Sequence, residues 1–184
     1  YGCTSLGSVV FPDKADRASF DKTIFYGVSN DKFYVSGPKM TSDNINNSSP
    51  RISTWNAEFA FNKATGEGKY VPYKYIEDGQ EIYEVSDGTY VLSVTKNGSD
   101  GILKSCLFAG TPQEIEELTI PASVGDIIIS TISDGCFNDT TNPKCILHEI
   151  KKFTIEDGSN ITHIGDNAFY DVNNGEGAKK DHAK

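Results

Sequence analysis

The stretch NITHIGDNAFYD, residues 160–171, has isoleucines and a phenylalanine spaced as if for burial. Extended back to residue 150, it carries five apolar side chains at offsets 0, 3, 5, 14 and 19: Ile150, Phe153, Ile155, Ile164 and Phe169. Side chains of a β-strand alternate between its two faces, so the first part of the pattern predicts a strand that buries Phe153 and Ile155. The later isoleucine and phenylalanine would fill the other half of the same coil of chain.

The same spacing occurs twice more. At the N-terminus it is formed by Leu6, Val9, Phe11, Phe20 and Phe25. A third copy, with three extra residues in its middle, is formed by Ile115, Leu118, Ile120, Ile132 and Phe137. The sequence FYDV at 169–172 also matches FYGV at 25–28. One such coil cannot bury both of its faces, so the pattern predicts coils that stack on one another. We expect Ile161, Ile164 and Phe169 to pack under Ile132 and Phe137.

Three stretches carry a family resemblance: YGCTSLGSVVFP (1–12), LTIPASVGDIIISTISDGCF (118–137) and ITHIGDNAFYD (161–171). They resemble the BspA-like leucine-rich repeats, which typically read L-x-I-P-x-S-V and then I-G-x-x-A-F-x-x-C-x-x-L. The match covers about residues 1–28 and 113–172. Cys136 stands where that family usually has alanine, a long loop separates the last two coils, and no asparagine ladder follows the strands. The resemblance implies a solenoid on the cell surface or outside the cell that adheres to a host or matrix protein.

Residues 29–112 show no repeat but are dense in strand signals, so the fold class is mainly β, with short solenoid segments at both ends. The segment 80–96 is typical of a hairpin that turns at Asp87-Gly88. Two organisations fit the middle: one inserted β domain, or a closing element (29–67) followed by a hairpin cap (68–112). We favour the second, because the ends of a solenoid need polar-backed lids. A polar tail, 173–184, would follow the repeats.

Composition limits the partners. The net charge is -9, from 17 basic and 26 acidic residues, with no basic face, which argues against binding to nucleic acid. No apolar run approaches the length of a membrane-spanning helix, so we expect no membrane insertion. The chain does not begin with Met, so the lack of a signal peptide carries little weight.

Catalytic and metal-binding patterns are weak. Cys145 and His148 could form a nucleophile–base pair, but a loop explains them equally well. Cys136 and His163 would complete a zinc ligand set, yet the spacing fits no known zinc finger. We therefore expect no enzyme, no metal and no cofactor. Cys136 and Cys145 flank a turn-rich loop that a disulfide could close, although two buried thiols are the simpler interpretation.

The outward strand positions of the last two coils are the predicted binding surface for a protein partner: Glu117, Thr119, Lys152, Thr154 and Glu156. The alternative is that neighbouring coils use this face. A second hypothesis is a carbohydrate-binding module in which aromatic rings of the middle region stack on sugars: Trp55, Tyr70, Tyr73 and Tyr75. More often such rings form the core of a cap.

Overall fold

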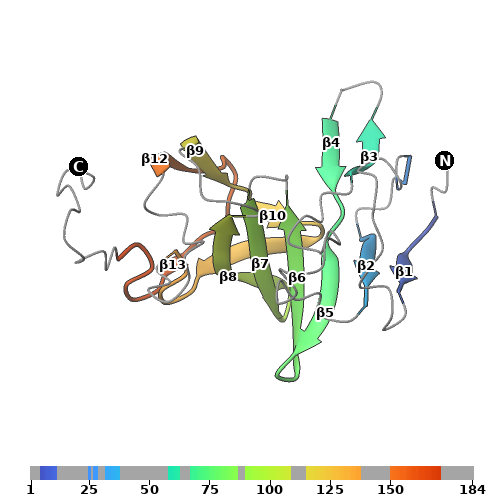
Figure 1. Cartoon of the computed structure of the whole chain (residues 1–184), viewed down its shortest axis with the longest axis horizontal. Coiled ribbons are helices and arrows are strands. Elements are labelled where there is room, and N and C mark those ends of the chain that lie inside the picture. Colours follow the sequence, from blue (N-terminus) through green and yellow to red (C-terminus); the bar gives the residue numbers. More distant parts are fainter. Residues whose placement is uncertain are drawn as a thin grey trace, which may run out of the picture.

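The computed structural model describes residues 5–11, 25, 27–28, 32–37, 58–62, 67–86, 90–108, 115–137 and 150–170. Every regular element in these ranges is a β-strand, so the prediction of a mainly β protein is confirmed (Figure 1). Strands β1 (Ser8–Val10) and β13 (His163–Ile164) lie toward opposite ends of the long axis (Figure 1).

Four antiparallel strands form the centre of the molecule: β5 (Tyr73–Glu77), β6 (Gln80–Ser86), β7 (Tyr90–Asn97) and β8 (Asp100–Phe108). The β5–β6 turn places Asp78 and Gly79 at φ 49° and 77°, the left-handed pair that a tight hairpin turn requires. Strands β6 and β7 pair from Ile82↔Thr95 to Ser86↔Val91. The antiparallel pairing of the hairpin predicted over 80–96 is therefore confirmed, whereas its predicted turn at Asp87-Gly88 lies outside the described residues.

Parallel strands extend this sheet on both sides. On the N-terminal side lie β1 (Ser8–Val10) and β2 (Tyr34–Ser36), in the order β1-β2-β5. On the other side β11 (Ile127–Ile132) pairs in parallel with β8, and β13 (His163–Ile164) pairs in parallel with β11. The short strand β10 (Ser123–Val124) pairs with β11 in the antiparallel direction. The result is one nine-stranded sheet that connects the N-terminal and C-terminal segments.

Strand β2 lies beside β1 in the nine-stranded sheet. It pairs in parallel with β1 in the register Val9↔Val35, and the Phe11 N–H donates to the Ser36 carbonyl at 2.7 Å. The apolar spacing of the repeat does not extend into residues 29–112. The pattern is broken because Gly37 stands where Phe11 stands one segment earlier.

Two small sheets complete the described fold. Strands β9 (Ile115–Ile120) and β12 (Ile150–Ile155) pair in parallel, while β3 (Glu58–Asn62) and β4 (Glu67–Tyr70) form an antiparallel pair. The predicted boundary between residues 67 and 68 falls within β4.

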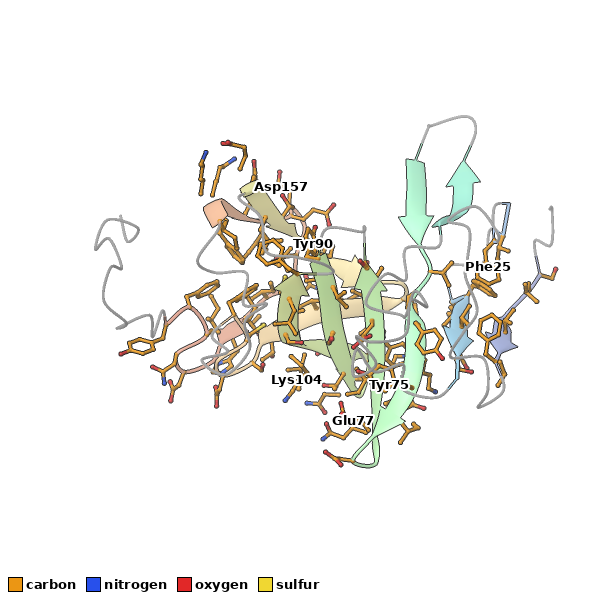
Figure 2. All side chains as sticks on the ribbon, in the orientation of Figure 1. Phe25, Tyr75, Glu77, Tyr90, Lys104 and Asp157 are labelled. Carbon is orange, nitrogen blue, oxygen red and sulfur yellow. The ribbon has the colours of Figure 1, made fainter. Side chains whose placement is uncertain are left out.

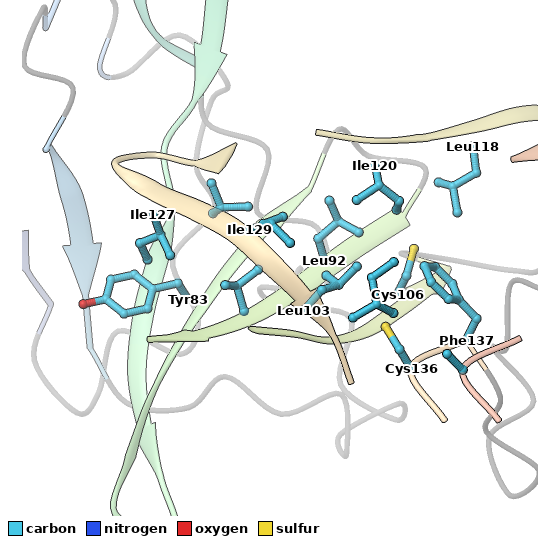
Figure 3. Close-up of a cluster of buried hydrophobic side chains, with 14 of the residues drawn as sticks. Tyr83, Leu92, Leu103, Cys106, Leu118, Ile120, Ile127, Ile129, Cys136 and Phe137 are labelled. Atoms are coloured by element: carbon cyan, nitrogen blue, oxygen red, sulfur yellow. The ribbon is translucent and has the colours of Figure 1, made fainter. Parts of the chain in front are cut away.

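Two cores lie on opposite faces of the nine-stranded sheet. Lys74 pairs with Tyr83 across β5 and β6, so Tyr83 shares a face with Lys74 and is on the opposite face from Tyr73. The core on the Tyr73 side also contains Phe25, Val28, Phe33, Val35, Val71, Tyr75 and Ile82. The core on the Tyr83 side includes Leu92, Leu103, Cys106, Leu118, Ile120, Ile127, Ile129 and Phe137 (Figure 3). Each buried valine, leucine, isoleucine or phenylalanine side chain stabilises the folded state by about 1.5–3 kcal/mol.

Residues 115–137 and 150–169 stack on each other in the predicted alignment. Strands β9 and β12 pair as Leu118↔Phe153 and Ile120↔Ile155, a separation of 35 residues. Strands β11 and β13 pair as Ile132↔Ile164, a separation of 32. The difference of three equals the three extra residues that the sequence places in the middle of the earlier segment.

The turns that follow β11 and β13 have the same form. Gly135 and Asn167, 32 residues apart, both have positive φ, at 60° and 54°. Cys136 and Ala168 are both buried at the next position. The rings of Phe137 and Phe169 then stack with centroids 4.9 Å apart and planes 10° apart. The predicted packing of Phe169 on Phe137 is confirmed.

The predicted packing of the two isoleucines needs one correction. Ile161 is partly buried against the core, as expected. Ile164 pairs with Ile132 along the backbone, but about half of its side chain is exposed. In the segment before it, the equivalent Ile132 is buried because a further segment covers it.

Candidate functional site: the outward face of β9 and β12

Strands β9 and β12 present alternate side chains to the core and to solvent. In β9, Leu118 and Ile120 are buried, whereas Glu117 and Thr119 are exposed. In β12, Lys152 is exposed and Phe153 packs against the core. The strand period of two therefore places the predicted polar residues on one outward face.

The outward residues contact one another across the two strands. Lys152 lies opposite Glu117, and its Nζ is 2.9 Å from Oε1 and 3.0 Å from Oε2 of that carboxylate. The Thr154 hydroxyl also donates a hydrogen bond to Glu117 Oε1. Thr154 in turn lies opposite Thr119. Four of the five predicted surface residues are thus brought together.

Further polar contacts border this group. Lys151 Nζ is 2.8 Å from Glu116 Oε1 at one end of the strands. At the other end, Glu156 Oε2 accepts a hydrogen bond of 2.7 Å from the backbone N–H of Ala122. Glu156, the fifth predicted residue, therefore holds the chain that leaves β9.

The electrostatics of this face centre on Glu117. The hydrogen bond from Thr154, followed by that from Lys152, lowers the pKa of its carboxyl below the ordinary value. The Glu117 side chain is 38% exposed, and ion pairs at the surface contribute little to stability. These contacts can therefore be exchanged for contacts with a partner at small cost.

The described part of the chain offers little for catalysis or metal binding. It contains no group of three His, Cys, Asp or Glu side chains that could hold a metal ion. Cys136 is a free thiol in a buried position, and burial raises its pKa to about 12, so it is not a nucleophile. Because Cys136 is a free thiol, the structure does not contain the disulfide predicted between Cys136 and Cys145. Cys145 and His148 lie outside the described residues, so the Cys/His pair stays a prediction. No helix in the described ranges is long and apolar enough to cross a membrane.

The aromatic residues of the middle region are placed differently from a sugar-stacking platform. Tyr73 and Tyr75 are buried in the core, and the Tyr75 hydroxyl donates to Glu84 Oε1 at 2.7 Å. Burial, followed by the charge of Glu84, raises the pKa of Tyr73 to about 12. A sugar cannot reach these two rings in this arrangement. Trp55 and the side chain of Tyr70 lie outside the described residues.

A second group of side chains escaped the sequence reasoning. Lys74 Nζ lies 5.3 Å from the ring centre of Tyr34 and 5.7 Å from that of Tyr83, and Lys96 Nζ lies 5.3 Å from Tyr83. Lys74 also forms an ion pair with Glu81. The alternating sequences YKYIE and QEIYEV indicate which side chains share a face of each strand. That these side chains lie close together can be predicted only once the pairing of β5 with β6 is known. The positive and negative charges of this group of side chains are already paired with one another, so the group is a weaker candidate for binding than the face of β9 and β12.

The candidate face lies at one end of the central sheet. The Tyr90 hydroxyl reaches the Thr119 carbonyl at 3.4 Å, and Figure 2 shows Tyr90 at the end of β7 next to this strand pair. Comparison with known proteins gave no further guide, since no family model, curated protein or solved structure matches the chain.

Proposed function

We propose that this chain is a non-catalytic leucine-rich-repeat protein of the BspA-like type, secreted or held at a cell surface, that presents a rigid strand face to a protein partner. The observation that carries the proposal is the register of β9 and β12, which places Glu117, Lys152 and Thr154 on one outward face. Adhesion to a host or matrix protein is the activity that the family resemblance implies.

The chemistry of the face supports a protein partner. It combines carboxylates, ammonium groups and a hydroxyl at the surface, and the side chains of Glu117, Lys152 and Thr154 contact one another there. Such polar groups form the rim of protein interfaces, where they fix orientation and association rate. The parallel pairing and the core beneath hold these groups in place, so little order has to be gained on binding.

The proposal is tested by binding to a panel of purified extracellular-matrix proteins, measured by surface plasmon resonance. Thr154→Arg places a bulky cation in the centre of the face and should abolish binding. The matched control is Ser99→Arg in the exposed β7–β8 turn, which should bind as the unaltered protein does. Circular dichroism checks that both variants fold. Unchanged binding by Thr154→Arg would contradict the proposal.

The carbohydrate alternative is separated by a glycan array. Two of its four rings, Tyr73 and Tyr75, belong to the core, so their replacement by alanine would report on folding. The informative variant is therefore Trp55→Ala. Glycan binding that this variant abolishes, together with no binding to matrix proteins, would favour the carbohydrate-binding module. Turnover of a substrate that depends on Cys145 or His148 would overturn both functions.

A further inference from the structure

The turn between β7 and β8 places an asparagine and a glycine next to each other at the surface. Asn97 is the last residue of β7 and lies opposite Asp100, the first residue of β8, so Gly98 and Ser99 form a two-residue turn. All four residues are exposed. Gly98 has a φ of 67°, which fits a hairpin turn with glycine at its first central position. Asn97 therefore lies at the exposed tip of a hairpin.

An asparagine followed by glycine can react within the chain. The backbone nitrogen of Gly98 loses its proton and forms a bond to Cγ of Asn97, the bond from Cγ to the side-chain nitrogen breaks, and ammonia leaves. The product is a cyclic succinimide, and the two reacting groups are already neighbours in the chain, which favours ring closure. Water then opens the ring at one of its two carbonyls. Opening at Cγ gives aspartate, and opening at the main-chain carbonyl gives isoaspartate.

The surroundings of Gly98 leave room for this reaction. A Cβ added at Gly98 would meet no atom of the described residues within 4 Å. Glycine itself has no Cβ and adopts more backbone conformations than any other residue. Asn97 and Asp100 form the terminal pair of the hairpin, and terminal pairs open at a smaller cost in free energy than pairs inside a sheet. Asn97 can therefore reach the reactive geometry while the rest of the sheet stays paired.

Two further exposed asparagines of the described residues provide a comparison within the same chain. Asn160 is followed by Ile161, and Asn167 is followed by Ala168. A side chain on the following residue crowds the attacking nitrogen, and a β-branched side chain does so most because its Cβ carries two heavy atoms. Of these three exposed asparagines, Asn97 has the least hindered neighbour.

We propose that Asn97 is a site of spontaneous modification, which converts through a succinimide with Gly98 into aspartate and isoaspartate as the protein ages. Either product carries a carboxylate at the position opposite Asp100, and like charges directly opposite each other destabilise a strand pair. Isoaspartate also lengthens the main chain by one carbon at the end of β7. The modification thus weakens the pairing of β7 with β8, which contributes Val94 and Leu103 to the core beneath β9.

The experiment is peptide mapping by mass spectrometry after the full chain has been incubated in neutral and in mildly alkaline buffer. The peptide that contains Asn97 should yield both isoaspartate and aspartate, faster in the alkaline buffer because the attacking nitrogen must lose its proton. Asn160 and Asn167 should stay unchanged. The proposal is overturned if Asn97 stays intact in the folded protein over a period in which the urea-unfolded chain converts. Aspartate as the sole product would exclude the succinimide and overturn it as well.

The effect on stability is measured by urea unfolding. Asn97→Asp adds the charge with a normal main chain and should raise the equilibrium constant of unfolding about 1.4- to 5-fold. The aged protein should lose more stability than this variant, because it also contains isoaspartate. Asn97→Gln, which would have to close a larger ring, is aged in parallel as the control for changes elsewhere, such as at Asn174, which glycine also follows. Equal losses in the aged protein and in aged Asn97→Gln would contradict the weakening of the hairpin.

Discussion

Replacement of Phe137 by alanine tests how the two stacked segments are held together. The side chain is buried, and its ring contacts Phe153 at a centroid distance of 5.2 Å and Phe169 at 4.9 Å. Loss of a buried phenylalanine costs about 3–5 kcal/mol in free energy of unfolding. Phe169 is partly exposed, and burying a whole ring contributes about 1.5–3 kcal/mol, so Phe169→Ala should cost about 1–2 kcal/mol.

The contact between the two rings is measured by the double variant. A stacked pair contributes about 0.5–1.5 kcal/mol beyond its buried area. The double variant should therefore lose less stability than the sum of the two single losses, by about that amount. Urea unfolding followed by far-UV circular dichroism gives all four free energies. Additive losses, to within about 0.3 kcal/mol, would mean that the rings are not in contact and would refute the stacked arrangement.

Three further predictions follow from single residues. Gly165→Ala places a Cβ 2.7 Å from the Ser133 carbonyl carbon and should lower the free energy of unfolding by about 1–3 kcal/mol in a urea titration; an unchanged midpoint would contradict the close approach. The Cys136 thiol, with its pKa raised to about 12 by burial, should react with a thiol reagent only after unfolding, and rapid labelling of the native protein would place it at the surface. The lowered pKa of Glu117 means that its contribution to stability is present above the pKa of the unfolded chain and is lost as pH falls through the folded-state pKa. Carboxyl NMR titration should show that Thr154→Val moves this pKa back toward its ordinary value, and no movement would contradict the hydrogen bond.

Apolar spacing was sufficient to predict the stacked C-terminal segments. The sequence separations between Leu118 and Phe153 and between Ile132 and Ile164 could be read from the sequence. They are visible there because the same apolar positions recur in each stacked segment. The outward positions of Glu117 and Lys152 followed from strand alternation. Their mutual ion pair could have been predicted from the same alignment, since opposite charges fall at the same position in consecutive layers.

The sheet that connects the two ends could not be predicted in the same way. Strand β2 has one buried apolar residue, Val35, at a position of the repeat. Gly37 occupies the next such position, where the first segment has Phe11. The placement of Tyr73 and Tyr75 in a core on one face, with Tyr83 on the other, depends on which strands become neighbours. Pairing between strands is a long-range choice, and local composition does not determine it.

The central claim is the parallel, in-register stacking of β9 and β12, and nuclear Overhauser contacts between the two strands test it directly. Parallel strands place amide protons of one strand near α-protons of the other, whereas antiparallel strands bring pairs of α-protons together. We expect amide-to-α contacts between the strands around Leu118 and Phe153, together with contacts between the rings of Phe137 and Phe169. Short α-to-α contacts between these strands, or the absence of contacts between the two rings, would contradict the stacked arrangement.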